Sequence, residues 1–153
     1  MAEPAREILE EQRSVGGAGT PDRDPSLFVD LLLQRSIDIH EAAKRWEGSV
    51  LFDRGVPDCI AYATLVGTDP TPSVLASEVY RYHTEVLVLE PWEEIYVGDE
   101  DRTMSFAETL EFQAAIEDAY ERAGYDLLQV PRESVENRAA LVRDFIIHRW
   151  PRR

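Results

Sequence analysis

The sequence is poor in cysteine and in lysine: Cys59 is its one cysteine and Lys44 its one lysine among 153 residues. A single cysteine excludes an internal disulfide framework and is typical of a reducing compartment. The sequence also lacks an N-terminal secretory signal and any apolar run long enough to cross a bilayer. We therefore expect a cytoplasmic protein with no membrane partner.

Positive charge is scarce as well, since 30 acidic side chains face 16 basic ones and the formal net charge is −14. A surface of this sign repels nucleic acid, so no nucleic-acid partner is expected. Nearly all the basic residues are arginines, whose planar guanidinium makes paired hydrogen bonds with phosphate oxygens. The composition therefore still allows a local phosphate-binding pocket.

The length and an apolar fraction of 44% suit one domain with a real core. Helical spacing of apolar residues, with cap residues such as Asp24, Ser105 and Ser134, predicts helices. Short apolar runs without polar alternation are typical of strands buried in a parallel sheet. Their alternation predicts an α/β fold, with a three-layer parallel sheet flanked by helices. The predicted helices are 3–13, 25–47, 57–66, 73–82, 106–123 and 135–150, and the predicted strands are 49–53, 85–89 and 125–130.

Asp53 and Arg54 end the first predicted strand, at the edge of an open parallel sheet where ligands bind. A carboxylate there can hold a magnesium ion through water, and the neighbouring guanidinium can bind a phosphate. Asp58, one turn into the next helix, is a further candidate metal ligand. The alternative is that Asp53 caps the following turn and Arg54 pairs with a surface acid.

Two weaker groups of residues accompany this pair. Glu3 lies just ahead of a helix and Arg6 one turn into it, an arrangement that suits a base or a substrate clamp. The alternative is that Glu3 is simply an acid at a helix N-terminus, where negative charge is favourable.

Arg102 ends the acidic segment 99–102 and could neutralise charge on a transferring phosphoryl group, as a kinase lid does. The alternative for this segment is a solvated loop.

Other chemistries lack the residues that they need. The three histidines have no ligand spacing, so a zinc site is not expected. Cys59 lies on an apolar helix and is expected in the core rather than as a nucleophile. The string Asp53-Arg54-Gly55 also occurs in metallophosphatases, but those need a Gly-Asp pair just upstream, and residues 47–49 do not provide it.

Taken in order, these motifs resemble the NadR-like group of AAA-type predicted ATPases, which are P-loop NTPases related to nucleoside and nucleotide kinases. The resemblance runs from Glu3 to Ile146. It rests on the helix start Glu3-Pro4-Ala5-Arg6, Arg35 in a long helix, Asp53-Arg54-Gly55 followed by Asp58, the stretch Pro91–Tyr96, Arg102, and the final strand Tyr125–Pro131.

The resemblance implies an ATP-binding ATPase or small-molecule kinase that uses ATP, Mg²⁺ and a small-molecule acceptor of unassigned class. Asp53, with Asp58, would organise the magnesium ion. Arg54 and Arg102 would bind phosphates, while Glu3 and Arg6 would face the acceptor or the attacking water.

Members of this family open with a strand, a Gly-x-x-x-x-Gly-Lys-Ser/Thr loop and a helix, which supply backbone amides, a lysine and a magnesium-binding hydroxyl. The sequence contains no such loop: residues 16–20 are glycine-rich but carry no lysine. We therefore expect residues 1–153 to form a single truncated P-loop NTPase-like domain without its first strand and P-loop. In related folds the first strand of the domain lies between the strand that ends at Asp53 and the strand that precedes Glu90. Without it, each of these two strands has an unpaired edge, and the two edges either pair with each other or stay exposed.

A chain without this loop is expected to bind ATP weakly or not at all and to be inactive by itself. Two other hypotheses stay open. The domain could be a non-catalytic binding or assembly module derived from such an enzyme, or the sequence could begin at a misplaced start codon.

Overall fold

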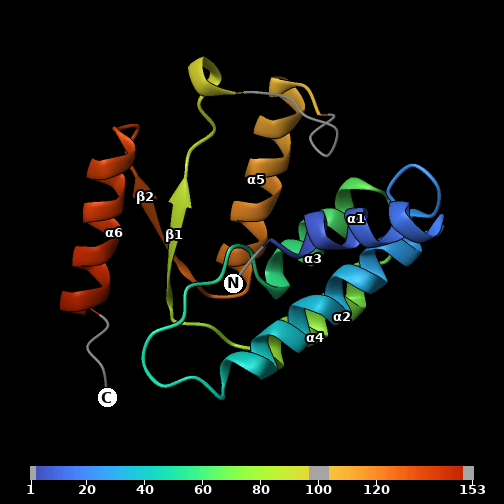
Figure 1. Ribbon diagram of the computed structural model, residues 1–153, viewed down its shortest axis with the longest axis horizontal. Helices are drawn as coiled ribbons and strands as arrows, with labels where there is room; N and C mark the ends of the chain where they lie inside the picture. The colour runs from blue at the N-terminus through green and yellow to red at the C-terminus, as the bar shows by residue number, and fades with distance from the viewer. Residues whose placement is uncertain (1–2, 97–103, 150–153) are drawn as a thin grey trace.

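The computed structural model describes residues 3–96 and 104–149 (Figure 1). Its helices and strands follow one another in the predicted alternation, with one exception discussed below. They are α1 (Pro4–Val15), α2 (Pro25–Ala43), α3 (Val56–Leu65), α4 (Thr71–Val79), β1 (Glu85–Leu89), the 3₁₀ turn η1 (Glu93–Ile95), α5 (Phe106–Arg122), β2 (Asp126–Val130) and α6 (Val135–Arg149).

The predicted helix starts are confirmed where a side chain caps the helix. The backbone N–H of Leu27 donates to the Asp24 carboxylate at 3.0 Å, at the start of α2. Ser105 and Glu108 form a reciprocal capping box at the start of α5. These starts are set by residues within one turn of each other, which is why the sequence predicts them.

β1 and β2 pair in parallel, with Glu85 opposite Asp126 and Leu89 opposite Val130. A parallel pair needs a long crossover, and α5 provides it. The two strands lie side by side between α5 and α6, while α1 to α4 gather on the far side of α5 (Figure 1). The predicted parallel pairing is confirmed for these two strands.

The predicted strand 49–53 is wrong, because this segment is irregular and the sheet of the described residues has two strands. Leu51, expected to be buried on both sides, is 47% exposed. A strand exists only when a neighbour satisfies its backbone hydrogen bonds, and β1 offers its free edge to an open hollow instead. A three-layer parallel sheet is thus not formed by the residues that the structure describes.

Helix α2 ends at Ala43 rather than at residue 47. The following backbone N–H groups bond to carbonyls three residues back, as Arg45 does to Ala42 and Trp46 to Ala43, so the last turn tightens. Trp46, inside the predicted helix 25–47, follows the end of α2 and is 67% exposed. The chain then crosses below β1 and rises to α3 (Figure 1).

Two groups of apolar side chains form the core. The first joins α1, α2 and α3 through Ile8, Phe28, Leu32 and Cys59. The second joins α3 to α5 and the start of β2 through Ala61, Phe112, Ile116 and Tyr125. Helix α3 takes part in both groups, so its first turn is held from two sides.

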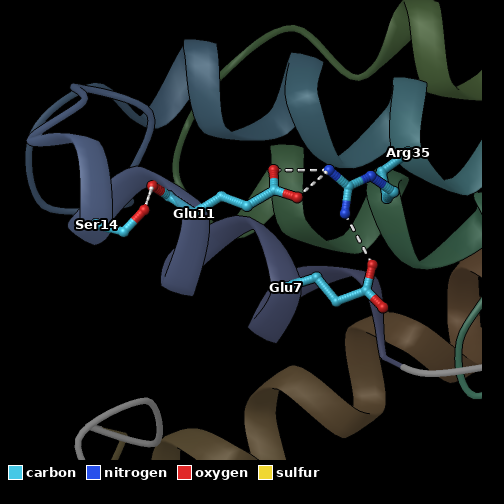
Figure 2. A network of polar contacts seen from close by, with 4 residues as sticks. All are labelled: Glu7, Glu11, Ser14 and Arg35. Atoms are coloured by element: carbon cyan, nitrogen blue, oxygen red, sulfur yellow. Dashed lines mark hydrogen bonds and ion pairs between the residues drawn. The ribbon is translucent and has the colours of Figure 1, made fainter.

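An ion-pair cluster fastens α1 to α2. The Arg35 guanidinium donates two hydrogen bonds to the Glu11 carboxylate, at 2.7 and 2.8 Å, and one to Glu7 at 2.8 Å. Figure 2 shows the guanidinium reaching across from α2 to both acids of α1. These contacts raise the pKa of Arg35, with the Glu11 hydrogen bonds as the largest cause.

Helix α6 is less firmly seated than predicted. The helical spacing of its apolar residues predicts a buried stripe, but none of the side chains described in it is buried, and Val135 and Ile147 are largely exposed.

None of the described helices combines the length and hydropathy needed to cross a membrane.

Candidate functional site

The turn that leads into α3 holds the backbone in a strained conformation. Arg54 has a φ of 77°, in the left-handed region, and is the one non-glycine residue with positive φ among those that the structure describes. Arginine has no side-chain means of compensating for this conformation, so the surrounding structure must impose it. Such strain persists where neighbours fix the backbone, and it is concentrated at functional sites.

Asp58 is the centre of this turn. Its carboxylate is buried and accepts hydrogen bonds from the backbone N–H of Gly55 at 2.8 Å, from Tyr120 Oη at 2.7 Å and from Arg54 Nη1 at 3.2 Å. The first bond caps α3 and the second ties α3 to α5. A buried carboxylate is costly unless it is paired and hydrogen-bonded, and here it is both.

Gly55 is in close contact with two tyrosines. A Cβ atom at this position would come within 2.9 Å of Tyr120 Oη and 3.0 Å of the Tyr82 ring. Its φ of −152° is ordinary extended backbone, so the glycine is required by space rather than by conformation. The turn is therefore packed tightly against α5 and the segment before β1.

Tyr82 and Tyr125 also stabilise this turn, through hydrogen bonds of their hydroxyl groups. Tyr82 Oη accepts a hydrogen bond from the backbone N–H of Val56 at 3.1 Å, and the backbone N–H of Tyr82 donates to Tyr125 Oη at 3.1 Å. Burial raises the pKa of Tyr82 and of Tyr120 well above the ordinary value, and the Asp58 charge raises the pKa of Tyr120 further. Both hydroxyls therefore stay protonated at neutral pH.

Arg54 is half-buried, with 35% of its side chain exposed. Burial acts to lower its pKa, but the negative charge of Asp58, with a smaller effect from Glu3, outweighs burial and raises it. Glu3 therefore lies within electrostatic reach of Arg54, although 51 positions separate them in the sequence. The guanidinium is charged and is bonded to Asp58 at the start of α3, while Glu3 at the start of α1 acts on it electrostatically.

A hollow of about 880 Å³ opens beside this turn. It is lined by the full length of β1 and by the irregular segment Gly48–Gly55. Arg54 and Asp53 line it together with Glu117 and Tyr120 of α5. The hollow thus runs along the free edge of β1, where a further strand would otherwise lie.

The structure brings several of the predicted site residues together. Glu3 accepts a hydrogen bond from Arg6 Nε at 3.2 Å, and Glu3 acts electrostatically on Arg54, which is bonded to Asp58. Asp53 is exposed and makes no hydrogen bond with another described residue, so it does not cap α3. Arg102 lies outside the described residues.

The fit to a magnesium ion is partial. Asp58 already accepts three hydrogen bonds, so its carboxylate has a structural part that the sequence did not suggest. Asp53 keeps its carboxylate oxygens available at the edge of the hollow. No group of three or more metal-binding side chains occurs in residues 3–96 and 104–149. A magnesium ion that keeps its waters and a nucleotide's phosphates needs only one or two protein carboxylates, and Asp53 suits that arrangement.

The tyrosine hydroxyls are the part of the site that sequence reasoning missed. The helical spacing of apolar residues in 106–123 indicates only that Tyr120 packs in the core, as aromatic residues at that spacing usually do. Its partner Asp58 is 62 residues away. No local pattern marks such a pair.

Comparison with known families decides the relationship. The family model described as "AAA domain" matches residues 1–138. The chain belongs to the AAA domain family. Searches of curated proteins and of solved structures found no match.

Membership of the AAA domain family gives the hollow a context. The family match indicates a P-loop nucleotide-binding domain, of a kind that generally binds nucleotide with Mg²⁺. In such domains phosphates are bound by backbone amides, a lysine and arginines around a strand end. In the described part of this AAA domain, an arginine and a carboxylate, Arg54 and Asp53, line the hollow beside β1.

Proposed function

We propose that this AAA domain contributes one half of a Mg-ATP site, in an ATPase or small-molecule kinase of the NadR-like type. The observation that carries the proposal is the strained turn at Asp53–Gly55, which presents an arginine and a carboxylate to the hollow along β1. Strain of this kind costs about 1–3 kcal/mol and is kept where a function requires the geometry.

In the proposed site, the Arg54 guanidinium donates hydrogen bonds to phosphate oxygens. One of its five N–H groups goes to Asp58, which leaves the others to a ligand. Asp53 orients magnesium-bound water. The nucleotide supplies the phosphoryl group to be transferred, and the protein's contribution is positioning and charge neutralisation.

The remaining residues take the outer positions. Glu3 and Arg6 form a pair at the start of α1 and face the acceptor or the attacking water. Arg102 would add a second positive charge from the segment between η1 and α5. The acceptor is a small molecule whose class follows from none of these residues.

The other half of the site is proposed to come from polypeptide outside these 153 residues. The sequence has no Gly-x-x-x-x-Gly-Lys-Ser/Thr loop. The free edge of β1 and the open hollow beside it are what a domain without its neighbouring strand and phosphate loop would show. We therefore expect the 153-residue chain to bind Mg-ATP no more tightly than the millimolar range.

The test compares the chain with a version extended by the in-frame codons upstream of Met1. If those codons encode an apolar strand and a Gly-Lys-Ser/Thr loop, calorimetry should show micromolar Mg-ATP binding for the extended protein. Asp53→Asn in that protein should weaken binding in magnesium but not in EDTA. Micromolar binding by the 153-residue chain itself would contradict the half-site proposal.

The second candidate is a non-catalytic binding or assembly module, which the absence of a lysine-bearing loop from the sequence favours. A stop codon close upstream of Met1 would support this candidate. So would an extended protein that binds no nucleotide.

A further inference from the structure

Tyr120 has an interaction with the turn that the proposed nucleotide site does not by itself require. It lies near the end of α5, is 7% exposed, and donates a 2.7 Å hydrogen bond to the Asp58 carboxylate. The same carboxylate accepts the bond from Arg54. Asp58 is thus a bridge between a buried hydroxyl on α5 and the one guanidinium at the turn.

Resting on the proposed function, we propose that Tyr120 is a positioning residue for Arg54. Through Asp58 it fixes the guanidinium toward the hollow, so that α5 sets how strongly the turn binds a phosphate-bearing ligand.

The first step of the argument is the geometry of the carboxylate. Asp58 Oδ2 accepts from both Tyr120 and the Gly55 N–H, while Oδ1 accepts from Arg54. Two donors on Oδ2 hold the plane of the carboxylate in place and leave Oδ1 directed at Arg54. Removal of the hydroxyl leaves one donor on Oδ2, so the carboxylate and the guanidinium bonded to it gain rotational freedom.

The second step is the state of Arg54 itself. Its backbone is in the left-handed region and 35% of its side chain is exposed. No other hydrogen bond restrains it among the described residues. A long side chain held at one N–H loses less freedom on binding a ligand than an unrestrained one, which strengthens binding.

The third step is that Tyr125, in the short connection between α5 and β2, offers a matched comparison. Tyr125 is equally buried, and its ring centroid is 5.4 Å from that of Tyr120. Its hydroxyl accepts from the Tyr82 N–H and does not touch Asp58. Tyr125→Phe therefore removes a buried hydroxyl from the same cluster and leaves the bridge to Arg54 intact.

The experiment uses inorganic pyrophosphate as the probe and the ¹H–¹⁵N signals of the full chain as the readout. We expect wild type to show a saturable shift of the Arg54 Nε–H signal. Tyr120→Phe should shift this signal in the free protein and raise the dissociation constant about 3- to 10-fold. Tyr125→Phe should leave both unchanged within twofold.

A second variant keeps the proposal testable if Tyr120→Phe does not fold. Asp58→Asn should weaken pyrophosphate binding at least as much, and where both fold, the double variant should bind no more weakly than Asp58→Asn alone, because Tyr120 acts through Asp58. Additive losses would overturn the bridging role, and so would a wild-type Arg54 signal and affinity in Tyr120→Phe.

Failure of the proposed function gives a different pattern. Arg54→Gln should abolish the saturable shift. If Arg54→Gln binds pyrophosphate as wild type does, or if wild type shows no saturable shift, the phosphate site itself is refuted and the positioning role with it. If only the Tyr120 variants behave as wild type, the phosphate site stands and Tyr120 is structural.

Discussion

At the scale of single residues, the turn before α3 shows how one buried carboxylate organises a site. The two carboxylate oxygens of Asp58 accept hydrogen bonds from the backbone N–H at the start of α3, from the Arg54 guanidinium and from the Tyr120 hydroxyl. The sequence suggests Asp58 as a metal ligand because it lies one turn into the helix that follows Asp53 and Arg54. In the structure the Asp58 carboxylate also caps that helix at Gly55, and the Tyr120 hydroxyl that completes its hydrogen bonding comes from a distant helix.

Gly55 gives a direct test of this packing. Gly55→Ala places a methyl group within about 3.0 Å of both Tyr82 and Tyr120, so the tyrosines or the turn must move. We expect a loss of about 1–3 kcal/mol in the free energy of unfolding, as for other overpacked positions. Urea denaturation measures it, and an unchanged midpoint would show that the turn is looser than described.

The buried thiol predicts how stability depends on pH. Burial raises the pKa of Cys59 to about 12 from an ordinary value of 9.0, with the Ser36 hydrogen bond only partly opposing it. The folded state therefore holds this proton more tightly than the unfolded state. The stabilisation is complete below pH 9 and is lost as pH rises toward 12, at about 1.4 kcal/mol per pH unit.

Cys59→Ala provides the control for this dependence. Between pH 9 and 10.5, the unfolding free energy of wild type should fall about 1.5 kcal/mol more than that of the variant. Both proteins keep a further alkaline loss, because burial also raises the pKa of Tyr62, Tyr82 and Tyr120. Equal slopes in the two proteins would show that the thiol is not shielded from solvent.

At the scale of elements, the sequence predicts what local interactions decide. Asp24 and the Ser105–Glu108 pair fix helix starts within one turn, and both starts were predicted. Residues 49–53 have the composition of a buried strand, but strand formation depends on a partner far away in the chain. The described residues give this segment no partner, so Leu51 stays exposed and the prediction fails.

In the candidate site, too, the sequence predicts the residues that are adjacent in the chain but not the contacts between distant segments. Asp53 and Arg54 could be singled out because adjacent residues mark a turn after an apolar run. The link from Glu3 to Arg54 and the bond from Tyr120 to Asp58 cross 51 and 62 positions, and only the packing of α1 and α5 against α3 creates them.

The Arg35 cluster predicts how firmly α1 is attached. Arg35→Gln removes the contacts to Glu7 and Glu11 that join α1 to α2. We expect a loss of about 1 kcal/mol, near the upper end for partly exposed pairs because one guanidinium pairs with two carboxylates. Amide hydrogen exchange should quicken in α1 more than in α5.

Lys44→Gln is the matched control, since Lys44 pairs with Glu41 within the exposed end of one helix. It should change stability by less than about 0.5 kcal/mol. The Arg35 effect should also shrink at 0.5 M salt, where exposed charges are screened. Equal effects of the two variants would mean that the cluster does not fasten α1.

At the scale of the whole molecule, the chain is an AAA domain whose described residues form a two-stranded sheet with a hollow along one edge. An exposed strand edge is a liability that proteins normally cover. Strand β1 and the strained arginine turn line the same hollow. In the proposed function they belong to one incomplete nucleotide site.

The most direct measurement is a titration of Mg-ATP into the ¹⁵N-labelled 153-residue chain, in wild type and in Arg54→Gln. We expect weak, saturable shifts in the millimolar range that are confined to residues lining the hollow and are lost in Arg54→Gln. Micromolar binding, or shifts of equal size in Arg54→Gln, would contradict the half-site proposal.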